Sequence, residues 1–347
     1  MTGNEAPRHA GPHAGTRLER HVHGALERGL AGRGWTPRVT PFTGYGGEGW
    51  VRVLARVVLA PPGTPRDEPA DGRGWRRFFS PWTGGATVQV EVAGAVHEVV
   101  STHDGYVDVR LPADLPTGWA TARLSGDGSE PAEAPLRIVG AGTCLGLVSD
   151  IDDTVIVTML PRPLVAFRNA FLVRESARRA VPGMAELYRE IVASHPDVFV
   201  VYLSTGAWNT AAALSGFLDR HDYPAGPLLL TDWGPTQERW FRSGPAHKRA
   251  QLARLFEELP HLQWLLVGDD GQHDTSLYAA ADAAEPDKVL GVAIRQLTLA
   301  QHLVGHGTAG ESELVEGPGP PGDPVMAPDG FGLRDGLVRR RLVLPGA

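Results

Sequence analysis

The sequence predicts an all-β domain followed by an α/β domain with a doubly wound parallel sheet. Between about residues 48 and 138, short runs alternate apolar and polar residues between Pro and Gly turns, which is typical of a β-sandwich or barrel. From 141 to about 304, continuous apolar runs alternate with helical patterns, as in buried parallel strands joined by helices. A length of 347 residues agrees with roughly two domains.

Changes in composition divide the chain into four segments. We expect a helix with a flexible leader over 1–40, a sandwich-like β domain over 41–140, the α/β domain over 141–304 and a Gly/Pro-rich, mostly unpacked tail over 305–347. The N-terminal helix is predicted by apolar residues at three-to-four-residue spacing, namely Leu18, Val22, Leu26 and Leu30.

Apolar runs give the expected strands and helices. In the β domain the expected strands are 50–58, 87–92, 96–100, 106–109 and 120–124. In the α/β domain the expected strands are 145–148, 198–203, 228–230, 264–267 and 289–294. The expected helices are 183–193, 209–220, 246–259 and 275–283. This alternation specifies right-handed crossovers between parallel strands.

Residues 73–82, inside the β domain, interleave arginines with aromatic residues. Such a segment suits phosphate head groups at a membrane interface. A loop whose rings cover the β core explains it as well, and we favour that second interpretation.

Composition excludes several classes of protein. Hydrophobic residues make up 42% and charged residues 21%, as in soluble globular proteins, and a net charge of -7 argues against nucleic-acid binding. Cys144 is the only cysteine, and we find neither a secretory leader nor a run of the roughly 18 apolar residues that a transmembrane helix needs. We therefore expect a cytoplasmic protein whose lipid contacts, if any, are peripheral, at the inner membrane surface.

Asp150, Asp152 and Thr154 follow the apolar run 145–148. Residues i and i+2 of an extended segment point the same way, so both carboxylates are expected to face one substrate. The chemistry this suggests is attack of Asp150 on phosphorus, with Asp152 moving protons and Thr154 contacting the phosphate. Helix capping is the alternative, but acids crowded at one buried strand end repel each other unless a cation such as Mg²⁺ is bound.

Ser204 and Thr205 follow the strand expected at 198–203. A hydroxyl beside free backbone N–H groups at that point is suited to a phosphate oxygen, although a helix N-cap is the simpler alternative.

Lys248 lies near the start of the helix expected at 246–259. The partial positive charge of a helix start opposes a cation, so a bound anion would explain the lysine, and it is expected to hold the transferring phosphoryl group. A solvated surface lysine is the alternative, and His247 and Arg249 are neighbouring candidates.

A second acidic segment follows the strand expected at 264–267. Asp269 is the best candidate for a further metal ligand, so we expect Asp150, Asp152 through its main-chain carbonyl and Asp269 to hold Mg²⁺. Asp270 and Asp274 are expected to surround these ligands, although Asp274 is equally placed to cap the next helix.

Together these elements resemble the haloacid dehalogenase (HAD) superfamily of aspartate-nucleophile phosphatases, over about 141–297. The narrower resemblance is to bacterial members of the phosphatidate phosphatase family first known from a yeast actin-patch protein. It rests on Ser149–Thr154 (SDIDDT), Val181–Met184 (VPGM), Gly226–Leu230 (GPLLL), Asp232–Gly234 (DWG), His247–Lys248, Gly268–Asp274 (GDDGQHD) and Ile294–Arg295.

The resemblance implies a Rossmannoid sheet and a Mg²⁺-dependent phosphatidate phosphatase that releases diacylglycerol. Asp150 would be the nucleophile and Asp152 the acid/base. The chain departs from the family at Ser204–Trp208 (STGAW), where Ser-x-Ser-Pro-Trp is usual, and at Asp270 and Thr275, which replace Ser and Pro. These changes affect substrate-side contacts rather than the core chemistry.

The segment between Thr154 and Val181 is too short for a large cap domain, so we expect a minimal cap. Its arginines and phenylalanines suit an anionic head group with acyl chains, and an amphipathic helix with solvated arginines explains them equally well.

Two alternatives to phosphatidate hydrolysis remain. The same chemistry would serve a soluble phosphomonoester or a nucleic-acid end. In the other alternative the protein is a non-catalytic adaptor that binds lipid or phosphoprotein through the β domain, and the acidic site only holds a cation. The sequence does not predict an oligomeric state.

Overall fold

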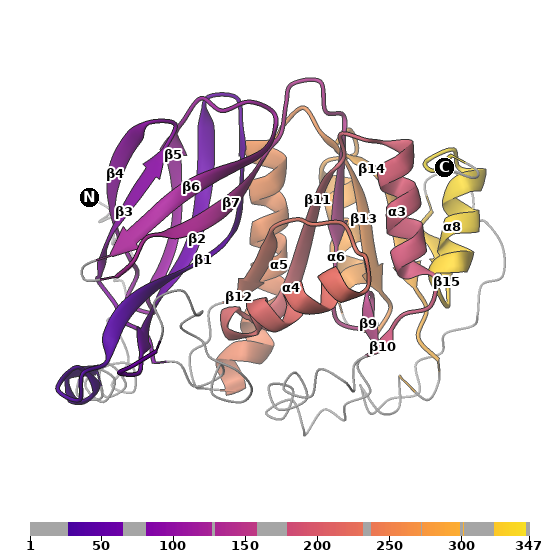
Figure 1. Cartoon of the computed structure of the whole chain (residues 1–347). Coiled ribbons are helices and arrows are strands. Elements are labelled where there is room, and N and C mark those ends of the chain that lie inside the picture. Colours follow the sequence, from indigo (N-terminus) through magenta and orange to yellow (C-terminus); the bar gives the residue numbers. More distant parts are fainter. Residues whose placement is uncertain are drawn as a thin grey trace, which may run out of the picture.

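A computed structural model describes residues 27–64, 81–126, 129–157, 179–231, 237–271, 273–298, 301 and 323–344 (Figure 1). Three sequence predictions lie mostly outside these residues. Of the expected N-terminal helix, only residues 27–31 are described. Of the arginine and aromatic segment at 73–82, only residues 81–82 are described. The expected minimal cap falls on residues 158–178, which lie outside the described residues.

The N-terminal part is a single seven-stranded sheet with the strand order β4-β3-β6-β7-β1-β2-β5. Its strands are β1 (Thr36–Gly47), β2 (Trp50–Ala60), β3 (Thr87–Val92), β4 (Ala95–Val100), β5 (Tyr106–Pro112), β6 (Gly118–Gly126) and β7 (Ala132–Ile138). Ala93 and Gly94, both with positive φ, form the two-residue turn between β3 and β4, as hairpin twist requires. The expected all-β composition is therefore present in the described residues.

The β domain differs from the expected sandwich in three ways. It is one continuous sheet that surrounds its own core of buried side chains such as Val53, Val90 and Leu124. The pair β1–β7 is parallel, whereas the strands of β-sandwiches typically pair in antiparallel orientation. The domain begins at Thr36 rather than at 41, because β1, whose Pro37 and Pro41 weaken the strand pattern, starts inside the segment expected to be a helix and leader.

The C-terminal part is an α/β domain. Its main strands are β8 (Leu145–Ser149), β11 (Phe199–Ala207), β12 (Leu228–Thr231), β13 (Gln263–Asp269), β14 (Val289–Arg295) and β15 (Val325–Ala327). Its helices are α3 (Met184–Ser194), η4 (Trp208–Thr210), α4 (Ala211–Arg220), α5 (Gln237–Glu258), α6 (Asp274–Ala284) and α8 (Gly330–Arg339). The two-residue strands β9 (Ile156–Val157) and β10 (Arg179–Ala180) pair with each other in antiparallel orientation.

The main sheet is parallel throughout, with the order β12-β11-β8-β13-β14-β15. In Figure 1, α3 and α4 lie in front of this sheet, and α5 and α6 lie behind it. Both faces are thus covered, which explains why the strands are continuous apolar runs. Strand β8 lies between β11 and β13, so three acid- or hydroxyl-bearing strand ends meet at one edge of the sheet.

The prediction that 305–347 is mostly unpacked is wrong for residues 323–344. Strand β15 adds to the open edge of β14, and α8 buries Leu333 and Leu337 completely. Gly330 lies so close to Gly183, at the start of α3, that a Cβ there would meet the Gly183 carbonyl carbon at 2.2 Å. The α/β domain therefore extends beyond the expected boundary at 304.

Part of the β domain packs into the hydrophobic core of the α/β domain. Tyr45, Trp50, Leu54 and Tyr106 of the β domain belong to the same buried cluster as the strands of the α/β sheet. Within the described residues, no helix is long and apolar enough to cross a membrane.

Candidate active site

Asp150 lies directly after β8, in the middle of the parallel sheet, and its side chain is buried. Its main-chain N–H donates to the carbonyl of Val267 on β13 at 2.9 Å. The hydroxyl of Ser149 donates to the carbonyl of Asp150 at 2.6 Å and lies 2.6 Å from the hydroxyl of Tyr188 on α3. These contacts hold the strand end, so the carboxylate has a fixed position at the sheet edge.

Lys248 holds the carboxylate of Asp150. Its Nζ donates to Oδ1 of Asp150 and to Oδ1 of Asp274, both at 2.6 Å, and the lysine is 3% exposed. The expected position near a helix start is wrong, because α5 begins at Gln237 and Lys248 is in its second half. Two carboxylates, rather than a helix end, explain why the ammonium is buried here.

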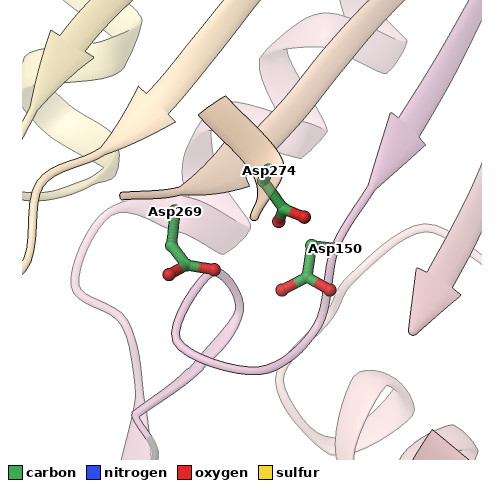
Figure 2. Close-up of side chains that lie close together, drawn as sticks. All are labelled: Asp150, Asp269 and Asp274. Carbon is green, nitrogen blue, oxygen red and sulfur yellow. The ribbon is translucent and has the colours of Figure 1, made fainter. Parts of the chain in front are cut away.

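Asp150, Asp269 and Asp274 form one buried acidic cluster. Each offers a carboxylate oxygen that lies within 4.8 Å of those of the other two. Figure 2 shows the three carboxylates around a common space, Asp150 after β8, Asp269 at the end of β13 and Asp274 at the start of α6. Oδ1 of Asp269 accepts from the N–H of Gly271 at 2.7 Å, while Oδ2 of Asp269 and of Asp274 have no hydrogen-bond partner within the described residues.

Burial dominates the electrostatics of the cluster. It raises the pKa of Asp150 to about 8, against the opposing effect of Lys248 and with a further rise from Asp274 and Asp152. Burial also raises the pKa of Asp269 well above its usual value, and Asp274 and Asp150 add to this. For Lys248, burial acts to lower the pKa, but the charges of Asp150 and Asp274 outweigh it and raise the pKa.

The cluster fits a hard divalent cation. Metal binding requires ionised carboxylates, and three of them beside one ammonium give a net charge of two negative units for a cation to balance in this buried site. The orphaned oxygens of Asp269 and Asp274 are of the type that Mg²⁺ prefers. Asp274 therefore belongs with Asp150 and Asp269, whereas the sequence placed it only around the ligands or at a helix cap.

Asp152 lies at the solvent side of the cluster. Its carboxylate is half-buried and accepts from the hydroxyl of Ser204 at 3.3 Å, so β8 and β11 bring the two together as expected. The hydroxyl of Ser204 also accepts from the N–H of Gly206 at 2.9 Å. This N–H was among the backbone donors that we expected to be free for a phosphate oxygen. The expected contact of the Asp152 carbonyl with Mg²⁺ stays a prediction.

Thr154 and Thr205 are both buried near this edge. The hydroxyl of Thr154 donates to Oδ2 of Asp150 at 3.4 Å, so the structure gives it a role in orienting Asp150. The carbonyl of Thr205 accepts from the hydroxyl of Thr231 at 3.0 Å, which fixes the end of β11. Their expected contacts with a phosphate group stay predictions.

Asp270 lies apart from the acidic cluster. Its carboxylate accepts from the main-chain N–H of Leu297 at 2.8 Å and thereby connects the loop after β13 with the residues after β14. A structural role for Asp270 follows, whereas the sequence placed it around the metal.

Two residues near Asp150 were missed by the sequence analysis as functional candidates. Tyr188 supports Ser149, but a tyrosine within an amphipathic helix gives no signal beyond core packing. Arg295 is almost fully buried and donates to the carbonyl of Asp153, which has a φ of 58°. The acidic segments near Arg295 were a usable signal, since a buried arginine needs acceptors.

Comparison with known proteins locates a similarity in the α/β domain. Residues 145–296 match the family model described as "Phosphatidate phosphatase APP1, catalytic domain". The chain is 27% identical over 153 residues to phosphatidate phosphatase APP1 of Saccharomyces cerevisiae, which is 44% of this chain and 26% of the yeast protein. It is 25% identical over 154 residues to an uncharacterized protein of Schizosaccharomyces pombe, or 44% of this chain and 25% of that protein.

A solved structure of the HAD domain of the effector protein Lem4 from Legionella pneumophila has 15% sequence identity and a TM-score of 0.29, over 44% of this chain and 85% of that chain. The chain spans about a quarter of the length of the curated relatives it matches. The α/β domain of this chain, over residues 145–296, is therefore similar to the catalytic domain of the phosphatidate phosphatase APP1 family.

Proposed function

We propose that the chain is a Mg²⁺-dependent phosphoric monoester hydrolase of the HAD type, which works through an aspartyl-phosphate. The observation that carries this proposal is the buried carboxylate of Asp150, held by Lys248 and faced by Asp269 and Asp274. Asp152, two residues further on, has a half-buried carboxylate that is suited to proton transfer. The similarity to the APP1 catalytic domain supports the same reaction class.

In the first step, Asp150 attacks phosphorus. Lys248 occupies Oδ1 of Asp150, so Oδ2, which is 3.4 Å from the Thr154 hydroxyl, is the freer oxygen for attack. The new bond joins this oxygen to phosphorus as the bond from phosphorus to the alcohol oxygen breaks. Asp152 donates its proton to the leaving alcohol, which leaves Asp152 as a carboxylate.

In the second step, the carboxylate of Asp152 accepts a proton from water as the water oxygen attacks phosphorus. The bond between phosphorus and Asp150 breaks, which releases phosphate and restores both carboxyl groups. Asp150 and Asp274 use two of the three protons of Lys248, and the third is available to a phosphoryl oxygen. Ser204 has one proton, which it gives to Asp152 in the structure, and with substrate bound it would give that proton to a phosphoryl oxygen instead.

Asp150, Asp269 and the main-chain carbonyl of Asp152 would hold Mg²⁺, with Asp274 close by. When bound, Mg²⁺ supplies positive charge that balances the carboxylates and stabilises negative charge developing on the phosphoryl oxygens.

The proposed substrate is phosphatidate at a membrane surface, with diacylglycerol and phosphate as products. The name of the yeast relative and the matched family model support this choice over a soluble phosphomonoester. The departures at Ser204–Trp208 fall beside the site, so they bear on substrate contacts rather than on Asp150.

The decisive experiment compares the natural protein with Asp150→Asn on p-nitrophenyl phosphate, with and without Mg²⁺. We expect turnover only with Asp150 and Mg²⁺ present. Asp153→Asn is the matched control, since Asn tolerates the positive φ at this position and Asp153 is outside the acidic cluster. Full turnover by Asp150→Asn would exclude the covalent mechanism, and no release from any ester would favour the adaptor.

A second assay identifies the substrate class. Phosphate release from vesicles should rise with the surface fraction of phosphatidate. Equal rates on short soluble phosphomonoesters would contradict a lipid substrate while leaving the covalent mechanism intact.

A further inference from the structure

The β domain contacts the segment that carries Ser204. Trp208 follows Ser204 by four residues, at the point where β11 ends and η4 begins. Its ring stacks on Phe42 of β1, with centroids 4.5 Å apart and planes at 28°, and lies 6.0 Å from the ring of Tyr106 on β5. Aromatic pairs at such separations contribute beyond simple burial. The end of β11 therefore rests on side chains of the other domain.

Within the α/β domain, the same segment is held mainly by hydrogen bonds. The hydroxyl of Thr231 on β12 donates to the carbonyls of Thr205 and Gly206, at 3.0 and 3.1 Å. The N–H of Gly206 in turn donates to the hydroxyl of Ser204. Thr231 thus fixes the backbone after Ser204 from one side, and the stack of Trp208 on Phe42 fixes it further along.

The β domain also contacts the helix that carries Lys248. Glu258 lies ten residues after Lys248 at the end of α5, where the helix stands beside β2 (Figure 1). Its carboxylate accepts from the hydroxyl of Tyr45 at 2.6 Å and from Nε of Arg52 at 3.1 Å. Arg254, one turn earlier on α5, pairs with Asp108 of β5 at 2.7 Å.

The contacts with α5 are largely shielded from water. Tyr45 is fully buried, and the side chains of Arg52 and Glu258 are 13% and 7% exposed. Hydrogen-bonded charge pairs at this depth hold their geometry more strongly than exposed pairs. Because a helix is rigid over ten residues, fixing its end at Glu258 restricts the position of Lys248.

We propose that the β domain is a positioning part of the catalytic site. Phe42 acts through Trp208 to keep Ser204 against Asp152, and Tyr45 and Arg52 act through Glu258 to keep α5, and with it Lys248, against Asp150. This inference rests on the proposed function for its kinetic test. The residues of the acidic cluster all lie in the α/β domain, and the family match begins at residue 145. The positioning role of the β domain therefore follows from neither of them.

The kinetic test is a double-mutant cycle on p-nitrophenyl phosphate with Mg²⁺. Phe42→Ala is expected to lower kcat about tenfold, as small displacements of positioned groups do, whereas Phe42→Tyr retains the ring and restores turnover. In the Ser204→Ala background, Phe42→Ala should add little, because its effect passes through Ser204. If the kcat losses of the two single variants multiply in the double variant, Phe42 and Ser204 act independently and the inference is wrong.

Val90→Ala is the matched control, because Val90 is buried in the β-domain core on β3, away from Phe42. This variant should lower the unfolding midpoint and leave kcat within about twofold of the natural protein, as a stability effect alone does. An equal loss of kcat in Val90→Ala and Phe42→Ala would overturn the inference.

Hydrogen–deuterium exchange provides a readout that does not depend on activity. Phe42→Ala should speed exchange in the peptide that contains Ser204 to Trp208. Glu258→Ala should speed exchange in the peptide that contains Lys248, and this variant provides the test if Phe42→Ala does not fold. Unchanged exchange at these positions would overturn the inference. If the natural protein releases no phosphate, the proposed function fails, while faster exchange would still support positioning by the β domain.

Discussion

The ammonium of Lys248 lies 2.6 Å from a carboxylate oxygen of Asp150, and both side chains are almost fully buried. Removing one partner of a buried ion pair strongly destabilises a protein, because the other charge is left without compensation. Here the loss would leave three carboxylates together, since Asp269 and Asp274 share the space. Lys248 therefore stabilises the fold around the site and also orients the proposed nucleophile.

Replacing Lys248 with Met should lower kcat on p-nitrophenyl phosphate by about 10²- to 10³-fold, the usual effect of losing one electrostatic contact to the reacting group. It should also lower the free energy of unfolding by about 3–5 kcal/mol without divalent cations. Urea unfolding with and without Mg²⁺ checks the second effect, and Mg²⁺ should recover part of it. Arg249→Met, an exposed neighbour on α5, is the control. Turnover equal to that of the natural protein would contradict the assigned role.

Asp274→Asn should weaken Mg²⁺ binding by about 10- to 100-fold, as changes next to metal ligands do. The reason is that Asp274 has an orphaned oxygen in the acidic cluster and also holds Lys248. Asp270→Asn is the matched control, because its side chain accepts from Leu297 and an amide oxygen preserves that bond. Titration of both variants with Mg²⁺ by calorimetry provides the comparison. If the two variants lose Mg²⁺ affinity equally, Asp274 is no closer to the metal than Asp270 and the assigned roles are wrong.

Asp150, Ser204 and Asp269 were predictable as neighbours from the sequence, because each follows an apolar run that forms a strand. The three strands, β8, β11 and β13, are adjacent and parallel, so their carboxyl ends meet at one edge. This reasoning needs only the periodicity of apolar residues and the rule for ligand sites in parallel sheets.

Contacts between distant segments were not predictable in the same way. The contact of Lys248 with Asp274 depends on how α5 lies against the sheet, and the stack of Phe42 on Trp208 joins two domains. The short strand β15 has three residues and follows a Gly/Pro-rich stretch, so its local pattern gives no signal. It is stable because β14 offers an open edge, which is a property of the assembled sheet.

His247 should make the protein less stable in mild acid. Burial lowers the pKa of His247 to about 4, with Arg254 and Lys248 adding to the effect, while its value in the unfolded chain is near 6.5. Between these values the unfolded chain binds more protons than the folded protein, so stability falls as the pH falls from 6.5 toward 4. The loss from pH 7 to pH 5 attributable to His247 is about 2 kcal/mol.

Urea unfolding of the natural protein and of His247→Gln at pH 7 and pH 5 measures this contribution. The variant should lose about 2 kcal/mol less than the natural protein over the interval, since Gln does not titrate. An identical pH dependence in the two proteins would show that folding does not lower the pKa of His247.

Leu333→Ala tests whether residues 323–344 belong to the α/β domain. Leu333 is fully buried on α8, which packs against α3 and β15, so truncation should leave a cavity and lower the free energy of unfolding by about 2–5 kcal/mol. Leu344→Ala is the control, because Leu344 is 57% exposed and its truncation should change stability by less than about 0.5 kcal/mol. Pulsed hydrogen–deuterium exchange along a urea titration follows the unfolding of the peptide that contains Trp264, in the core of the same sheet. A shift of that transition in Leu333→Ala means that α8 and β15 unfold with the sheet, whereas an unshifted transition would show that they form a separate unit.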